Sequence, residues 1–118
     1  MDRVLIEGLA VECIIGVYAW EREVPQRLQV DVSLAWDNRV PGASDRVEDA
    51  LDYAVAAEVI TQVLQEGRFA LLEAAAEAMA TALHQRFATP ALTLTLRKPG
   101  AVAQATAVGV SIERSWRA

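Results

Sequence analysis

The chain is poor in the residue types on which several common active sites depend. Its 118 residues include one cysteine, Cys13, and one histidine, His84. One cysteine cannot form an intramolecular disulfide, and a single histidine excludes Ser-His-Asp hydrolases and multi-histidine zinc enzymes. We expect Cys13 to be a strand core residue and His84 a helix surface residue, neither with a role in chemistry. Any catalysis must therefore depend on carboxylate, lysine, tyrosine or arginine side chains.

Positive charge is also scarce. Eleven Lys and Arg stand against sixteen Asp and Glu, which gives a net charge of −5. This balance leaves no basic stripe for a nucleic acid. Residues 1–17 carry Asp2, Glu7 and Glu12, which break both a signal-peptide pattern and a membrane-spanning run. The sequence therefore predicts a cytoplasmic protein with no nucleic-acid partner and no membrane partner.

What the chain does have is apolar residues in regular patterns. It is 53% hydrophobic and 23% charged, which suffices for a packed core, and we expect a single domain over residues 1–118. Apolar and polar residues alternate over 26–37, and again over 92–97 and 108–113, which predicts strands with one buried face. Residues 3–17 are rich in Val and Ile and predict a long strand that bends or bulges at Gly8 or Gly16.

Two longer segments have helical periodicity. Residues 53–66 and 71–87 place their apolar residues on one stripe, and Gly67 stands where a left-handed cap would end the first helix. Asp45 and Glu48 have the spacing of a capping box before a short helical turn. The resulting order, β-β-α-α-β-β, indicates an α+β fold with an antiparallel sheet and both helices on one face.

The other face of the predicted sheet is polar but carries few charges. Its residues include Gln29, Ser33, Thr93, Thr95 and Ser111. A four-stranded sheet also leaves two unpaired edges. Pairing of edges between subunits in a closed ring would cover both features, whereas a monomer would leave the face solvated, and the periodicity does not decide between them.

Lys98 is the only lysine beside ten arginines. A lysine can be tuned toward its neutral form, whereas an arginine stays charged, so a lone lysine is a candidate acid–base group. Lys98 is followed by Pro99 and Gly100, however, and Lys-Pro-Gly is an ordinary turn. On the residues alone, the turn interpretation is favoured.

Two carboxylates and a tyrosine are further candidates. Glu21 follows Tyr18 and Trp20, so it could be a base in a partly dry cleft, although an exposed loop position is favoured on the residues alone. Glu73 falls in the first turn of the second helix, where the helix dipole favours an acid, and it could also accept two parallel hydrogen bonds from a planar N–H edge. Tyr53 opens the first helix and offers a phenol and a stacking face.

Seven stretches in one collinear order together resemble the dihydroneopterin aldolases, lyases of folate biosynthesis. They are IGVYAWE at 15–21, QRLQVDV at 26–32, DALDY at 49–53, FALLE at 69–73, KPGAV at 98–102, VGV at 108–110 and IER at 112–114. The resemblance implies the tunnelling fold (T-fold), in which subunits pair edge to edge into rings. It also implies a homo-octamer of two stacked tetramers with active sites at subunit interfaces.

The resemblance further implies a reaction and its residues. 7,8-Dihydroneopterin is cleaved to 6-hydroxymethyl-7,8-dihydropterin and glycolaldehyde, and its own N5=C6 imine accepts the electrons, so neither a cofactor nor a metal is expected. Glu73 and the backbone of Leu72 would hold the pterin edge, and Lys98 would be the general acid/base, supported by Glu21. Tyr53 of a neighbouring subunit would stack on the pterin and relay a proton. Epimerisation at C2′ is expected as a side activity, giving 7,8-dihydromonapterin.

Three alternatives are weighed against this one. The sister enzyme that epimerises dihydroneopterin triphosphate lacks the Lys-Pro-Gly-Ala block found here at 98–101, and a triphosphate would favour more local cations. Pyruvoyl-tetrahydropterin synthase needs three zinc-binding histidines and is excluded by the single His84. A non-catalytic ring-forming assembly domain predicts no pterin binding and indifference to loss of Lys98.

Overall fold

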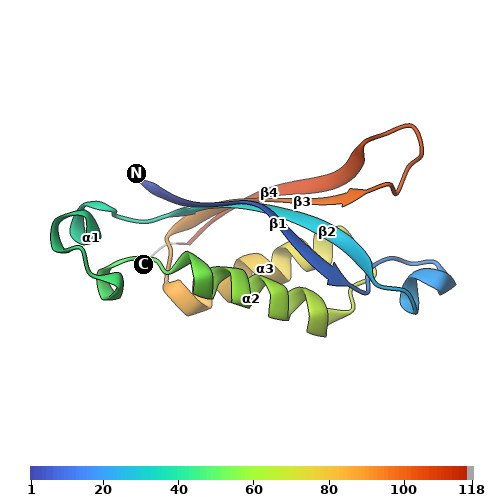
Figure 1. The fold of residues 1–118 in the computed structure, drawn as a ribbon, viewed down its shortest axis with the longest axis horizontal. Coiled ribbons are helices and arrows are strands. Elements are labelled where there is room, and N and C mark those ends of the chain that lie inside the picture. The colour runs from blue at the N-terminus through green and yellow to red at the C-terminus, as the bar shows by residue number, and fades with distance from the viewer. Residues whose placement is uncertain (117–118) are drawn as a thin grey trace.

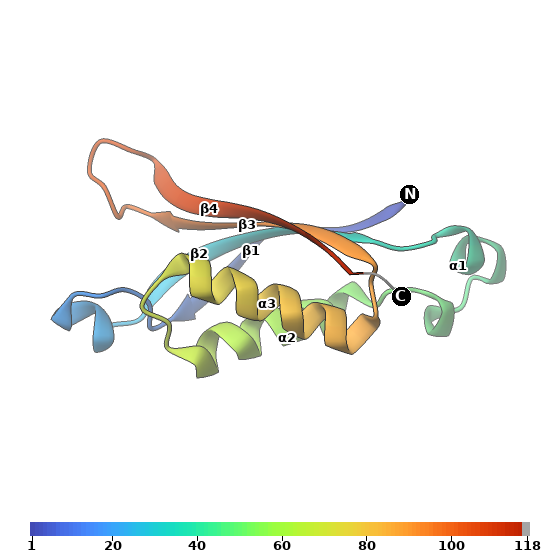
Figure 2. The same ribbon diagram turned by 180° about the vertical axis from the view of Figure 1, so that it is seen from behind.

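The computed structural model describes residues 1–116 and consists of one sheet covered on one face by two helices (Figure 1). The strands are β1 (Arg3–Cys13), β2 (Gln26–Ala35), β3 (Ala91–Pro99) and β4 (Ala107–Ser115). They are antiparallel in the order β1-β2-β3-β4, so β1 and β4 are the two edges. The helices α2 (Tyr53–Gly67) and α3 (Leu72–Phe87) run side by side beneath it, as the view from behind also shows (Figure 2).

The core lies between this sheet and the two helices, as the alternation predicts. On β2 the buried residues are Leu28, Val30, Val32 and Leu34, and on β3 they are Leu92, Leu94 and Leu96. Ile60 and Leu64 of α2 and Met79 and Leu83 of α3 close the core from below. Cys13 is 4% exposed, which confirms it as a core residue, and burial raises the pKa of its thiol.

The predicted break in the first strand is confirmed at Gly8, but the strand is shorter than predicted. The pairing of β1 with β2 shifts between Ile6 and Leu9, and Gly8 has a φ of 66°. The N–H of Gly8 donates a hydrogen bond to the Asp31 carboxylate, at 2.8 Å. The strand ends at Cys13 instead of residue 17 because Gly16, at φ 123°, leaves the ladder and donates its N–H to the carbonyl of Phe69.

The cap predicted at Gly67 is wrong by one residue. Gly67 is the last residue of α2, and Arg68 takes the left-handed conformation, with a φ of 47°. A Cβ at Gly67 would overlap the ring of Phe69, so the glycine is needed for close packing. The other end of α2 is capped by Asp52, whose carboxylate accepts from the N–H groups of Ala54 and Val55.

The predicted capping box at Asp45 and Glu48 is also wrong. Asp45 instead ends α1 (Arg39–Ser44), a short helix that the sequence did not predict, in the left-handed conformation. The short 3₁₀ turn η2 (Val47–Asp49) then begins after Arg46, with no side-chain cap. The hydroxyl of Ser44 instead bonds to the Asp49 carboxylate at 2.6 Å and links the end of α1 to this turn.

His84 is half-buried, not a free helix surface residue. Its ring stacks on Trp116 at 4.1 Å between centroids, and its Nδ1 lies 2.9 Å from the carbonyl oxygen of Thr89. The contact fastens the end of β4 to α3 and involves none of the candidate site residues. No helix within residues 1–116 combines the length and apolarity needed to cross a bilayer.

Candidate active site

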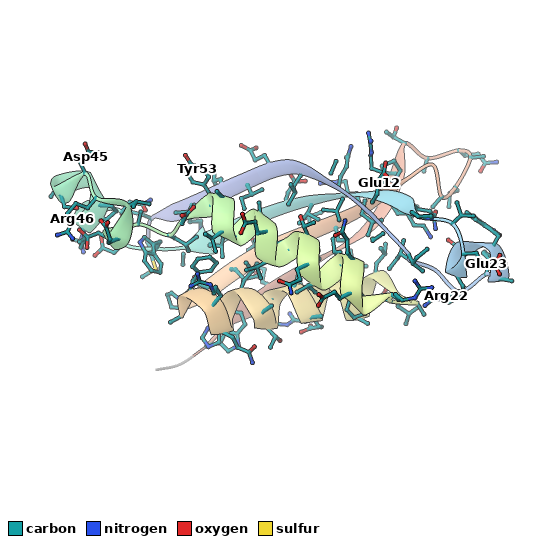
Figure 3. All side chains as sticks on the ribbon, turned by 60° about the horizontal axis from the view of Figure 1, so that its bottom comes forward. Glu12, Arg22, Glu23, Asp45, Arg46 and Tyr53 are labelled. Atoms are coloured by element: carbon teal, nitrogen blue, oxygen red, sulfur yellow. The ribbon has the colours of Figure 1, made fainter. Side chains whose placement is uncertain are left out.

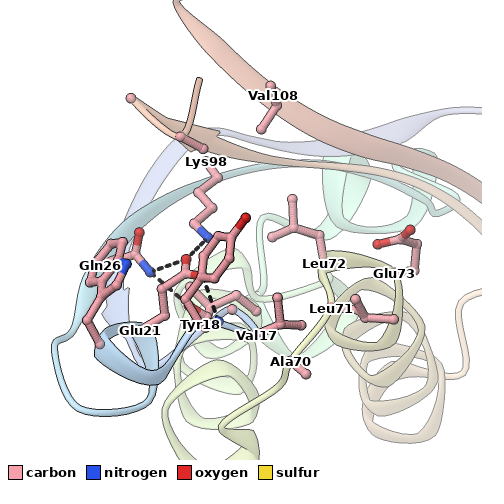
Figure 4. Close-up of a pocket in the computed structure, with 15 residues that line it drawn as sticks. Val17, Tyr18, Glu21, Gln26, Ala70, Leu71, Leu72, Glu73, Lys98 and Val108 are labelled. Atoms are coloured by element: carbon pink, nitrogen blue, oxygen red, sulfur yellow. Dashed lines mark hydrogen bonds and ion pairs between the residues drawn. The ribbon is translucent and has the colours of Figure 1, made fainter. Parts of the chain in front are cut away.

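A cavity of about 360 Å³ opens at the end of the molecule where β1 and β2 are connected. One wall is the loop that follows β1, and the opposite wall is the segment that leads into α3 (Figure 4). The end of β3 and the start of β4 cover it from the sheet side, through Lys98 and Val108. The exposed side chains of Tyr18, Trp20 and Leu71 form an apolar rim.

Glu21 and Lys98 form an ion pair in this cavity, between Oε2 and Nζ. Glu21 belongs to the 3₁₀ turn η1 (Ala19–Arg22), which folds its carboxylate inward, and the residue is 4% exposed. Lys98 reaches it from near the end of β3, with a side chain that is 13% exposed. The favoured exposed-loop interpretation of Glu21 and the favoured surface-turn interpretation of Lys98 are therefore both wrong.

Two further donors complete the surroundings of the Glu21 carboxylate. The side-chain amide of Gln26 donates to Oε2 at 3.0 Å, and the backbone N–H of Tyr18 donates to Oε1 at 3.2 Å. The hydrogen bond from Lys98, followed by that from Gln26, lowers the pKa of Glu21 from 4.5 to about 2 against the opposing effect of burial. The carboxylate is thus held ionised beside a cation.

Gly16 makes room for this carboxylate. A Cβ at Gly16 would overlap the carboxylate of Glu21, and the φ of 123° is one that other residues rarely adopt. The N–H of Gly16 also bonds to the carbonyl of Phe69 at 3.2 Å. One glycine therefore brings the carboxylate loop against the segment that leads into α3.

Leu72 and Glu73 lie across the cavity from this pair, in the first turn of α3. Glu73 is exposed, and Leu72 is partly buried. The first turn of a helix presents N–H groups without intrahelical partners, and its dipole favours an anion such as Glu73. This wall combines a carboxylate acceptor with backbone polar groups, which suits the planar N–H edge of a heterocycle.

Tyr53 lies at the other end of the molecule, at the first residue of α2, whereas Arg22 and Glu23 mark the cavity end (Figure 3). It does not line the cavity, and it is 66% exposed. The structure therefore brings together Glu21, Lys98, Leu72 and Glu73, but not Tyr53, within one chain.

Gln26 and the N–H of Tyr18 were not singled out as site groups from the sequence. Gln26 also donates to the carbonyl of Ile15 at 2.8 Å and so fastens the loop that carries Glu21. The only signal for it is its place at the start of the second resembling stretch. The N–H of Tyr18 could not be predicted from residue type, because it is a backbone group that any residue except proline has at that position.

The charges that line the cavity are few. Lys98 is the single cation among the lining residues, against the carboxylates of Glu21 and Glu73. Within residues 1–116, no three His, Cys, Asp or Glu side chains are grouped as ligands of a metal ion would be. What the lining offers is one paired acid–base couple, one further carboxylate, backbone amides and apolar surface.

The chain is similar over nearly its whole length to proteins of one family. The family profile FolB, described as dihydroneopterin aldolase, matches residues 4–113. The dihydroneopterin aldolase of Escherichia coli K12 is 49% identical over 114 residues, which are 97% of this chain and 93% of that protein. The enzyme of the same name from Haemophilus influenzae is 41% identical, with 97% of each chain covered.

A solved structure extends the similarity to three dimensions. The crystal structure of E. coli dihydroneopterin aldolase in complex with neopterin superposes with a TM-score of 0.94 at 49% identity. The match covers 98% of this chain and 100% of that one. The α+β T-fold expected from the element order and the resemblance is thereby confirmed.

Proposed function

The chain belongs to the dihydroneopterin aldolase family, carbon–carbon lyases of folate biosynthesis, and from this premise we propose that Lys98, supported by Glu21, is the general acid/base of the cleavage. The observation that carries the proposal is their ion pair, which faces Glu73 across one cavity. The substrate is 7,8-dihydroneopterin, and the products are 6-hydroxymethyl-7,8-dihydropterin and glycolaldehyde.

Glu73 and the backbone of Leu72 hold the pterin. The N3–H and 2-amino group of a pterin form a planar edge that can donate two parallel hydrogen bonds to one carboxylate. Glu73 is exposed, lines the cavity and lies in the first turn of α3, which supports this role. With the pterin edge at this wall, the side chain at C6 extends toward Glu21 and Lys98 on the other wall.

Cleavage then requires proton transfers at both ends of the breaking bond. A base removes the proton of the 2′-hydroxyl, the C1′–C2′ bond breaks to give the glycolaldehyde carbonyl, and its electron pair moves to C1′=C6 while N5 gains a proton. Protonation of C1′ and loss of the N5 proton then give the hydroxymethyl product. In this proposal Lys98 performs the steps near N5 and the hydroxyl, and its ion pair with Glu21 supports this role. Each such step contributes roughly 10²–10⁴-fold.

Tyr53 of a neighbouring subunit completes the site in this proposal. Its exposed phenol and its distance from the cavity of its own chain support a role in another copy's cavity. The edges β1 and β4 support pairing between copies, because neither has a second strand partner among residues 1–116. We infer rings joined edge to edge, stacked as an octamer of two tetramers.

A cavity with one cation, itself paired, favours a neutral side chain on the substrate over a triphosphate. Re-addition of glycolaldehyde through its other face would give the C2′ epimer as a side product. One core cluster joins the sheet to both long helices, which supports a single domain, and a cytoplasmic location remains a prediction.

The test is anaerobic turnover of 7,8-dihydroneopterin, following both products, with a chelator and without added metal. We expect cleavage by the wild type in the chelator, and a loss of about 10²-fold or more in kcat for Lys98→Ala. The control is Arg27→Ala, an exposed residue paired with Glu12 on the sheet. Epimerisation of the triphosphate alone, or no pterin binding, would overturn the proposal in favour of the sister epimerase or an assembly domain.

A further inference from the structure

Arg22, the residue after Glu21, bonds to three backbone carbonyls that come from two segments far apart in the sequence. Its Nη1 donates to the carbonyl of Gly16 at 3.0 Å and to that of Phe69 at 3.1 Å. Its Nη2 donates to the carbonyl of Arg68. In the opposite direction, Nη2 of Arg68 donates a hydrogen bond to the carbonyl of Arg22, at 3.1 Å.

These carbonyls belong to the two walls of the cavity. Gly16 is in direct contact with the Glu21 carboxylate, on the wall that carries the acid–base pair. Arg68 and Phe69 lead into α3, whose first turn carries Leu72 and Glu73. The carbonyl oxygen of Phe69 accepts hydrogen bonds from both Arg22 and the N–H of Gly16. This one oxygen therefore makes two bonds between the wall that leads into α3 and the wall that carries Glu21.

The chemistry of the guanidinium suits this position. It presents five N–H donors in a fixed plane, whereas the donors of a lysine diverge from a single nitrogen. The left-handed conformation of Arg68 ends α2, and its carbonyl receives a bond from Arg22. Arg22 itself does not line the cavity, although Gly16 and Glu21 do, so any effect on substrate passes through those neighbours.

We propose that Arg22 is a positioning residue that fixes the Glu21–Lys98 pair relative to the pterin-holding groups at Leu72 and Glu73. The inference rests on the proposed function. The first turn of α3 stays in place without Arg22, because Ala75 and Ala76, at the end of this turn and the start of the next, are buried in the core. The loop with Gly16 and Glu21 loses three bonds, so the chemical step suffers more than binding of the pterin edge.

The experiment compares Arg22→Ala, Arg22→Lys and the exposed control Arg27→Ala with the wild type. We expect kcat for Arg22→Ala to fall about 10–100-fold, as for a reacting group displaced by about 1 Å. We expect KM, and the affinity for neopterin measured by fluorescence, to change less than about 3-fold because the α3 wall is intact. Arg22→Lys keeps the positive charge but not the planar set of guanidinium donors, and it should recover only part of the lost kcat.

Chemical rescue separates positioning from a loss of folded protein. Millimolar guanidinium chloride should raise kcat of Arg22→Ala while ammonium chloride does not, because only the planar ion can refill the three acceptors. A variant with the kcat of Arg27→Ala would overturn the proposal. So would a loss shared equally by kcat and neopterin affinity without rescue. An inactive wild type would instead overturn the proposed function, which keeps the two failures distinct.

Discussion

At one end of the molecule Glu21 is 4% exposed and accepts hydrogen bonds from Lys98, Gln26 and Tyr18, whereas at the other end Tyr53 is 66% exposed. The carboxylate is ordered by its own chain before any substrate arrives. The tyrosine stands at the N-terminus of α2 with its phenol toward solvent. The difference teaches that the chain orders the Glu21 carboxylate with its own donors but leaves the Tyr53 phenol exposed, as the proposed use of Tyr53 in a neighbouring copy's cavity requires.

If the buried Glu21 carboxylate depends on Lys98, removing the Lys98 cation should lower the stability more than the other substitutions proposed below. Lys98→Met leaves the buried Glu21 carboxylate without its cation, which should lower the free energy of unfolding by about 3 kcal/mol. Denaturant unfolding at one protein concentration measures it. Adding Glu21→Gln to Lys98→Met should restore most of that stability and none of the activity. A double variant as unstable as Lys98→Met would contradict the dependence of the Glu21 carboxylate on Lys98.

Gly16 gives the next largest effect at the same end. Gly16→Ala places a Cβ against the Glu21 carboxylate at a φ of 123°, and should cost roughly 1–3 kcal/mol in unfolding free energy. Gly42→Ala is the matched control, since a Cβ there meets nothing within 4 Å and its φ is not positive. Equal thermal stability of the two variants would argue against a tightly packed carboxylate loop.

The acid dependence of stability sharpens the comparison further. The pKa of Glu21 is lowered from 4.5 to about 2 by Lys98 and Gln26, so its contribution is present above about pH 4.5 and is lost as the pH falls through 2. Glu21→Gln should flatten this part of the stability profile. Asp37, paired with the exposed Arg39, also has a pKa of about 2. Its effect should disappear in high salt, while that of Glu21 persists.

The exposed end should show the smallest effect on stability. Tyr53→Phe removes only a hydroxyl from an exposed ring, so the free energy of unfolding should change by less than about 0.5 kcal/mol. The kcat should nevertheless fall by roughly 10²-fold if, as proposed, the phenol acts as a proton relay in a neighbour's cavity. Thermal unfolding and steady-state kinetics on one preparation measure both, and unchanged kcat would remove Tyr53 from the mechanism.

The sequence predicted the regular parts of the fold because their signals are local. Alternation marked the buried face of β2, and the apolar stripe marked α3 up to Phe87. The short helix α1 was missed because its residues include Pro41 and Gly42, which carry little helical signal. The cap at Arg68 was misplaced because the need for a glycine at 67 comes from the ring of Phe69, a packing contact.

The candidate site likewise has one part that the sequence predicted and another part that it could not predict. Glu73 could be placed in the first turn of a helix from periodicity alone, and the structure has it there. The burial of Glu21 could not be predicted from its neighbours, because it depends on Lys98, 77 residues away. The role of Arg22 likewise comes from carbonyls 46 and 47 residues away, which no local pattern encodes.

The most direct test of a site shared between copies is to co-express two differently tagged variants, Lys98→Ala and Tyr53→Ala, and to purify the mixed oligomers through both tags. Each variant alone should be nearly inactive. Random mixing pairs an intact Lys98 with an intact Tyr53 in about one site in four, so the mixed oligomers should recover about a quarter of the wild-type kcat. Activity no higher than that of the separate variants would contradict the account.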